Sequence, residues 1–191
     1  YEKKTDSFYI EKSNIPESID FILTIDSDTQ ILRESAAKLI GAMLHPLNKP
    51  ILSKDGKHVE SGYGLITPTV GVDIEQAAKS KLAFSFAGSP GLDSYSACAS
   101  NVYQDVFNEG IFAGKAIFDL KTYILVLEGA FEDERVLSHD FLEGHYLRTG
   151  LSSDVVFMDG YPKNYISWAQ RQHLWTRGDW QHLAWLKGTV K

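Results

Sequence analysis

The chain has 191 residues, with 19 Lys and Arg against 25 Asp and Glu, a formal net charge of −6, and 43% hydrophobic residues. This composition excludes intrinsic disorder, which needs fewer hydrophobic residues and more charge, and it supports a buried core. The acidic balance gives no basic footprint for a nucleic-acid backbone, so we expect no nucleic-acid partner. The single cysteine, Cys98, cannot form an internal disulfide, and we expect it to be a buried, reduced thiol.

The first 20 residues are mostly polar and charged. They contain neither the apolar core of a signal peptide nor the roughly 20 apolar residues of a membrane span. We therefore interpret residues 1–20 as a polar lead-in and residues 21–191 as one domain without linkers or repeats.

Apolar runs and helical periodicities alternate along the chain. The run Phe21–Ile25, rich in β-branched residues, predicts a buried strand that ends at Asp26. Apolar residues at helical spacing predict a helix over residues 32–44, and Asp55-Gly56 predicts a turn. The stretch 62–72 is β-prone but broken by glycine and Pro68, which indicates an edge strand or two short strands with a bulge.

The same patterns continue in the second half of the chain. They predict helices at residues 75–86, 102–107, 120–127 and 140–149, strands at 111–118 and 154–158, and a long aromatic helix opening at Pro162. Gly150 suits the left-handed position after the fourth of these helices. Strands that alternate with helices favour an α/β fold with a partly mixed sheet.

Three segments carry residues suited to chemistry, and the first is Asp26-Ser27-Asp28. Two carboxylates at the carboxyl end of a strand can face the crevice where open α/β sheets bind ligands. Hard oxygen ligands suit Mg²⁺ or Mn²⁺ bridging the phosphates of a substrate. The alternative is a turn or a helix N-cap, where Asp and Ser are also common.

The second segment is the helix start around Asp140. A carboxylate at a helix N-terminus stays ionised next to the positive end of the dipole and can serve as a general base towards a sugar hydroxyl. An ordinary helix cap is the alternative. His139 and His145 lack further ligands at zinc spacing, so we interpret them as packing or hydrogen-bonding residues.

The third segment is the polar and aromatic run 170–180. Trp168 and Trp175 share a helical face, and aromatic planes beside Arg and Gln donors can cradle a sugar ring or a pyrophosphate. The alternative is an amphipathic helix whose tryptophans belong to the core.

In this order the three segments resemble the processive family-two glycosyltransferases, the group of cellulose, chitin and hyaluronan synthases, which have a GT-A fold. More closely, residues 21–185 resemble the glycosyltransferase domain of the cyclic β-1,2-glucan synthases. The resemblance rests on Ile25-Asp-Ser-Asp-Thr-Gln30, His45-Pro-Leu-Asn-Lys-Pro50, Tyr103-Gln-Asp-Val-Phe107, Gly114-Lys115, Leu137-Ser-His-Asp-Phe-Leu-Glu-Gly144 and Trp175-Thr-Arg-Gly-Asp-Trp-Gln181.

The resemblance implies an inverting transfer of glucose from UDP-glucose to a growing β-glucan, on a partial GT-A-like mixed sheet flanked by helices. It implies that Asp26 and Asp28 bind Mg²⁺ or Mn²⁺ with the diphosphate, and that Asp140 activates the acceptor hydroxyl. The substrate-binding residues that it implies lie on the segment that closes over nucleotide and acceptor: Trp175, Arg177, Asp179 and Trp180.

The sequence departs from the family pattern in two motifs. Arg171 and Leu174 stand at the Gln and Arg positions of the Q-x-x-R-W motif, and His139 replaces a Glu. GT-A domains also supply strands before the D-x-D, so we expect a piece of a larger synthase that works at the cytoplasmic face of a membrane. The remaining domains would be its partners, and the isolated piece would bind UDP-glucose weakly.

Two other functions fit parts of the pattern. A carbohydrate-binding module would hold a glucan on the aromatic surface without chemistry. A Mg²⁺-dependent phosphotransferase of the haloacid-dehalogenase type also begins with an apolar strand and D-x-D, although that family has Thr or Val where this chain has Gln30.

Overall fold

The computed structural model describes residues 18–86, 102–131, 136 and 139–183, so Cys98 and most of the lead-in lie outside the described residues. The strands are β1 (Phe21–Thr24), β2 (Gln30–Ile31), β3 (Ile51–Leu52), β4 (Val59–Ser61), β5 (Leu65–Val72), β6 (Ala116–Asp119) and β7 (Thr149–Asp159). The helices are α1 (Ser35–Leu44), the 3-10 turn η1 (Pro46–Asn48), α2 (Ile74–Ala77), α3 (Lys81–Phe86), α4 (Val102–Phe107), α5 (Leu120–Leu127), α6 (Asp140–Leu147) and α7 (Tyr165–Gln181).

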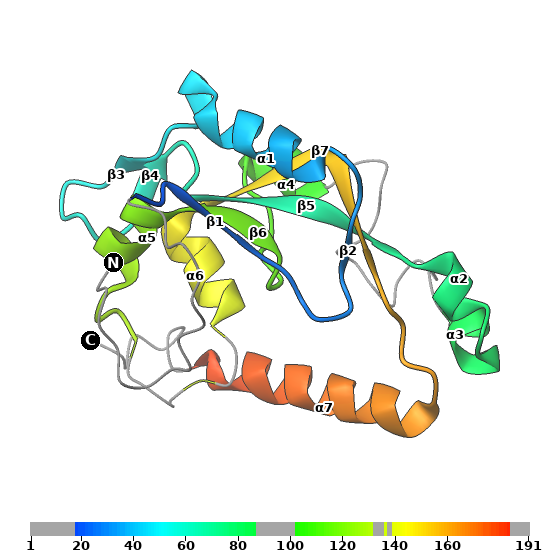
Figure 1. Ribbon diagram of the computed structural model, residues 1–191. Helices are drawn as coiled ribbons and strands as arrows, with labels where there is room; N and C mark the ends of the chain where they lie inside the picture. Colours follow the sequence, from blue (N-terminus) through cyan, green and yellow to red (C-terminus); the bar gives the residue numbers. More distant parts are fainter. Residues whose placement is uncertain (1–17, 87–101, 132–135, 137–138, 184–191) are drawn as a thin grey trace, which may run out of the picture.

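The main sheet of the described chain has the strand order β1-β6-β5-β7-β2, and β3 and β4 form a separate hairpin. β5 and β7 run parallel, whereas the other neighbours in the main sheet are antiparallel. Helix α1 covers one face of the sheet, and α5 and α6 lie on the other (Figure 1). The mixed α/β fold predicted from the sequence is confirmed. No helix in the described ranges is long and apolar enough to span a bilayer.

The core is divided by the sheet into two clusters, and β6 contributes to both. Phe118 belongs to the cluster under α5 and α6, whereas its neighbour Ile117 belongs to the cluster under α1. This alternation follows from the two-residue period of a strand. Leu39 from α1 and Phe157 from β7 are fully buried, and each such side chain contributes about 1.5–3 kcal/mol by leaving water.

Two strands occupy different positions in the sheet from those predicted. β1 lies at an edge and is only partly buried, because it pairs with β6 alone among the described strands. β5 lies in the centre instead of at an edge, between β6 and β7. The predicted bulge is present, because the pairing of β5 with β7 shifts register between Pro68 and Thr69. A proline without an N–H is tolerated in a central strand at such a shift.

Several element boundaries also differ from the sequence pattern. Helix α1 begins at Ser35, after Glu34 in a left-handed conformation. The predicted helix 75–86 divides into α2 and α3, because the Ser80 hydroxyl accepts a hydrogen bond from the backbone of Ala83 and starts a new helix. The predicted strand 111–118 begins only at Ala116, since Gly114 has a φ of +85° that no strand accommodates.

The end of α6 shows a further difference. Arg148, and not Gly150, has a positive φ (+54°) after the helix, and β7 begins at once at Thr149. Arg148 is held there by hydrogen bonds to the carbonyl of Gly62 and the carboxylate of Glu109. Helices α4 and α5 and the turn at Asp55-Gly56 lie where they were predicted.

Substitution by alanine at two helix-interior glycines is expected to change the stability in opposite directions. A Cβ at Gly144 would lie 2.8 Å from both Phe112 Cβ and Thr149 Oγ1, whereas a Cβ at Gly41 would meet nothing within 4 Å. We expect Gly144→Ala to lower the free energy of unfolding by ~1–3 kcal/mol because it overpacks α6 against the core. Urea unfolding followed by circular dichroism measures this change.

Gly41→Ala is the matched control, because it makes the same substitution inside a helix with open space around it. It is expected to raise the free energy of unfolding by ~0.5–1 kcal/mol through helix propensity alone. Equal changes of the same sign in the two variants would contradict the close approach of α6 to Phe112.

Candidate active site at one edge of the sheet

The strand pairing brings three chain segments to one edge of the sheet. Because β1 and β6 are antiparallel, the carboxyl end of β1 lies beside the amino end of β6, with Thr24 opposite Ala116. β5 lies between β6 and β7, antiparallel to β6 and parallel to β7. β7 therefore runs opposite to β6, and its carboxyl end points to the same edge. Asp26 follows β1, Lys115 directly precedes β6 and Asp159 ends β7, so the three residues meet there.

Lys115 is the centre of this edge. Its Nζ lies 2.5 Å from Asp26 Oδ2 and 2.8 Å from Asp159 Oδ2, and the lysine exposes only 6% of its surface. Burial alone would lower the pKa of Lys115, but the hydrogen bonds and charges of Asp159 and Asp26 raise it above its usual range. The Thr29 hydroxyl donates to Asp159 Oδ1 at 2.6 Å. Lys115 is therefore a fixed, buried cation between two carboxylates.

Gly114 is where Asp26 and Asp140 approach each other. A Cβ on Gly114 would lie 3.3 Å from Asp140 Oδ2 and 3.8 Å from Asp26 Oδ1. The two carboxylate oxygens therefore lie no farther apart than the sum of these distances. The Thr24 hydroxyl donates to the carbonyl of Gly114 at 3.1 Å and holds this loop against β1. The absence of a side chain at Gly114 leaves both carboxylates facing the same small space.

Asp28 lies at the same edge, beside the end of β7. A Cβ on Gly160 would lie 3.2 Å from Asp28 Oδ2, which places this carboxylate next to the residue that follows Asp159. The segment also forms a turn, because the N–H of Thr29 donates to the carbonyl of Asp26. It does not cap α1, whose N-cap is Glu34. The predicted site residues Asp26, Asp28 and Asp140 thus share one edge of the sheet.

The start of α6 positions Asp140. His139 is the N-cap, without a side-chain capping bond, and Asp140 is the first helical residue, so the simple capping interpretation of Asp140 is wrong. One turn later, burial raises the pKa of Glu143, and the charge of Asp140 raises it further. The Tyr123 hydroxyl donates to Glu143 Oε1 at 3.3 Å. Asp140 and Glu143 are both partly buried.

A cavity of about 380 Å³ lies beside this helix turn. The His139 ring lies 5.3 Å from the Phe131 ring, and the buried His139 Nε2 has no hydrogen-bond partner among the described residues. The residues that line the cavity are Tyr123, Ile124, Leu127, Glu128, Gly129, Phe131, His139 and Glu143.

Helix α7 carries the remaining predicted site residues. Trp175 and Trp180 are 53% and 67% exposed, and Trp168 is partly buried, so the interpretation of the tryptophans of this helix as core residues is wrong. The Arg171 guanidinium lies 4.7 Å from the Trp175 ring centre. At the end of α7, His182 stacks on Phe141 at 5.7 Å, next to Asp140.

No hydrogen bond or ion pair between described residues joins Arg177 or Asp179 of α7 to the three predicted carboxylates. The structure brings the end of α7 to the start of α6 through the stacking of His182 on Phe141.

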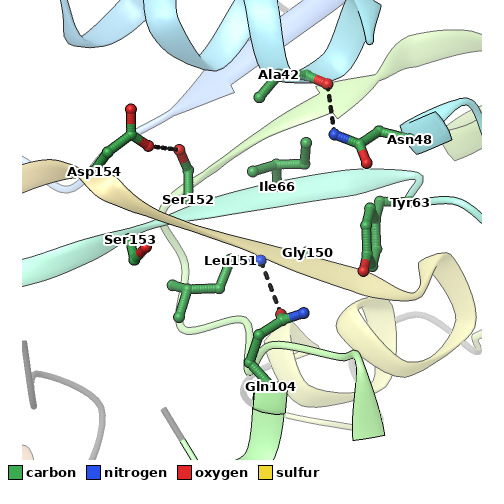
Figure 2. A pocket seen from close by; sticks show the side chains of 10 residues that line it. All are labelled: Ala42, Asn48, Tyr63, Ile66, Gln104, Gly150, Leu151, Ser152, Ser153 and Asp154. Atoms are coloured by element: carbon green, nitrogen blue, oxygen red, sulfur yellow. Dashed lines mark hydrogen bonds between the residues drawn. The ribbon is translucent and has the colours of Figure 1, made fainter. Parts of the chain in front are cut away.

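A second cavity, of about 300 Å³, lies between α1, α4 and β7 and contains none of the predicted site residues (Figure 2). Its polar groups are largely paired with one another. The N–H of Leu151 donates to Gln104 Oε1, Asn48 donates to the carbonyl of Ala42, and Ser152 donates to Asp154.

The donor set at the edge suits a divalent cation that shares its ligands with a substrate. Among the described residues, no group of three or more His, Cys, Asp or Glu side chains could hold a metal alone. Asp26 and Asp28 are exposed, and Asp26 Oδ1 faces Gly114 while only Oδ2 accepts from Lys115. Mg²⁺ is commonly held by one or two carboxylates together with substrate phosphates, which matches this arrangement.

Sequence reasoning missed Asp159 and gave Lys115 no role. Asp159 ends the apolar run of β7 just as Asp26 follows the run of β1, so the same strand-then-acid pattern could have found it. Lys115 lies between the apolar stretches Ile111–Phe112 and Ala116–Phe118. A lysine in such a position is rarely buried unless it is paired.

No family model matches the chain. The curated cyclic beta-(1,2)-glucan synthase NdvB of Rhizobium meliloti (strain 1021) is 35% identical over 184 residues, which cover 95% of this chain and 6% of that protein. The chain thus spans a small part of the length of this relative. Because the identity extends over nearly the whole chain, the chain is related to a segment of the cyclic β-(1,2)-glucan synthase.

Proposed function

We propose that this chain is the part of a glucan synthase that transfers glucose from UDP-glucose to a growing β-glucan. The observation that carries the proposal is the approach of Asp26 and Asp140 to the same face of Gly114. A metal-binding carboxylate and a general base must lie this close, because the diphosphate and the attacking hydroxyl stand on opposite sides of one anomeric carbon. The similarity to a glucan synthase supports the same choice of substrates.

In the proposed reaction Asp140 is the general base. Its carboxylate takes the proton from an acceptor hydroxyl, and the hydroxyl oxygen forms a bond to the anomeric carbon of glucose. The bond between this carbon and the diphosphate oxygen breaks, and UDP leaves with the electron pair. A single displacement of this kind inverts the anomeric configuration.

The departing diphosphate needs compensation of its negative charge. Asp26 and Asp28 would hold Mg²⁺ or Mn²⁺, which supplies that compensation when bound. We assign Trp175, Arg177, Asp179 and Trp180 to the surface that receives the sugar and the diphosphate. Their support is the exposure of the two tryptophans and the contact of the end of α7 with α6.

Asp140→Asn tests the proposed base. The amide cannot accept the proton, so we expect the rate of glucose transfer from radiolabelled UDP-glucose to fall by about 10²–10⁴-fold. Binding of UDP in the presence of Mn²⁺, measured by calorimetry on the same samples, is expected to stay within about twofold, since the base does not hold the diphosphate.

Asp105→Asn is the matched control, because Asp105 is an exposed carboxylate on α4 and lies on none of the segments that form the site. Its transfer rate should equal that of the unmodified chain. An Asp140→Asn variant with the full rate of transfer would contradict the role of Asp140. Binding of a glucan by the unmodified chain without any transfer of glucose would instead favour a glucan-binding module.

Asp26→Asn and Asp28→Asn test the metal and diphosphate subsite. Each change removes a charged oxygen ligand, so calorimetry with Mn²⁺ should show UDP binding at least ~10-fold weaker than in the unmodified chain. Loss of a residue that only hydrogen-bonds to a metal ligand already lowers metal affinity by about 10-fold or more, so loss of a ligand itself should cost at least as much. EDTA should weaken UDP binding to the unmodified chain in the same way.

Unchanged UDP binding in both variants would place the diphosphate elsewhere. Mg²⁺-dependent release of phosphate from p-nitrophenyl phosphate, without any UDP binding, would instead support the phosphotransferase alternative.

A further inference from the structure

Lys115 occupies the position that a cation would take between two carboxylates. Its Nζ touches Asp26 Oδ2 and Asp159 Oδ2 at ion-pair distances, and these oxygens come from the ends of two different strands. Its backbone is fixed as well, because the Thr67 hydroxyl donates to the carbonyl of Lys115 at 2.8 Å. The ammonium is therefore held in place from both ends of the residue.

The surroundings of this ammonium are strongly acidic. Asp28 lies beside Gly160, the residue after Asp159. Asp140 lies beside Gly114, the residue before Lys115. Asp26 Oδ2 and Asp159 Oδ2 are the carboxylate oxygens in direct contact with the ammonium. Without Lys115 these two oxygens would face each other with no positive charge between them, and two carboxylates together with water ligands can hold a divalent cation.

We propose that Lys115 excludes divalent cations from the carboxylate edge until a nucleoside diphosphate arrives, so that metal and diphosphate bind together. This inference rests on the proposed function, because it assumes that the diphosphate of the donor binds at this edge. It makes Lys115 a positioning residue for Asp26.

The mechanism is electrostatic competition. A metal ion bound to Asp26 alone would lie within a few ångströms of the buried ammonium, and two cations at that distance repel each other strongly. A diphosphate adds negative charge and supplies oxygen ligands to the metal, so it offsets this repulsion. The metal would then bind tightly only as part of the complex with the nucleotide.

Lys115→Met in the 191-residue chain tests the proposal by a gain of binding. The substitution keeps an unbranched side chain of similar length and removes the charge. Calorimetry with Mn²⁺ and no nucleotide is expected to show binding at least ~10-fold tighter than in the unmodified chain, because the repulsion between the two cations is gone. A variant that merely unfolds cannot gain affinity. Equal or weaker Mn²⁺ binding in a Lys115→Met variant with a native circular dichroism spectrum would overturn the proposal.

Three further variants show where the gain arises. Lys115→Arg keeps the positive charge and should bind Mn²⁺ as weakly as the unmodified chain. Lys121→Met removes an exposed lysine from α5 and should change nothing. Asp26→Asn combined with Lys115→Met should lose the gain. A gain in Lys121→Met, or one that survives the loss of Asp26, would overturn the proposal, because the metal would then lie elsewhere.

A second titration separates this proposal from the proposed function. Mn²⁺ is titrated into the unmodified chain with and without UDP, and tighter binding with UDP is expected. If Mn²⁺ binding is equal with and without UDP, coupled binding is overturned. If UDP binds neither chain while Lys115→Met still gains affinity for Mn²⁺, the donor assignment fails but the exclusion of free metal by Lys115 stands.

Discussion

The pairing of one buried lysine with two aspartates determines the geometry of the whole edge. Lys115 joins the start of β6 to the end of β1 through Asp26 and to the end of β7 through Asp159. A buried charge is tolerated only when its partners are close, so the ends of these strands must stay together. The Thr29 hydroxyl adds a neutral partner to Asp159 and ties the turn after β1 into the same network. The candidate site is thus held by charge, while the core beneath it is held by apolar packing.

Two glycines determine how closely α6, which carries Asp140, approaches the segment that leads into β6. Gly144 lets α6 lie against Phe112 without a side chain between them, and Gly114 leaves room for Asp140 above the loop that leads into β6. Both contacts involve the same short stretch of chain, residues 112–114. The position of the proposed base is therefore set by close contact with the segment that leads to Lys115.

The sequence predicted most elements of the fold where local chemistry decides them. Helix α5 lies where its periodicity placed it, and Asp119 caps it by accepting from the N–H of Thr122. The predictions were wrong where contacts between distant parts of the chain determine the structure. The central place of β5 could not be read from its glycine and Pro68, because a strand's neighbours depend on the order of the sheet. The break between α2 and α3 depends on the Ser80 hydroxyl, which also donates to the distant carbonyl of Lys163.

The site was predicted in the same uneven way. The proximity of Asp26 to Asp140, and the place of Asp28 at the same edge, follow from positions visible in the sequence, because each stands after a strand or at the start of a helix. Their roles remain proposals. Asp159 and the role of Lys115 depend on which strand ends meet, and a single sequence does not contain that information. The α7 residues were identified by resemblance, and the exposed faces of Trp175 and Trp180 fit a surface role better than a core role.

The register shift in β5 and β7 has a consequence for how the length of this chain can vary. β7 advances from Ser152 to Val156 while β5 advances only from Pro68 to Thr69. Side chains alternate between the faces of a strand, so inserting or deleting one residue in this stretch would exchange the faces of Phe157 and Met158. Phe157 would leave the core, and Asp159 would turn away from Lys115. Changes in length among related chains should therefore be absent between Ser152 and Asp159 and collect in the turn between β3 and β4, residues 53–58, none of which is buried.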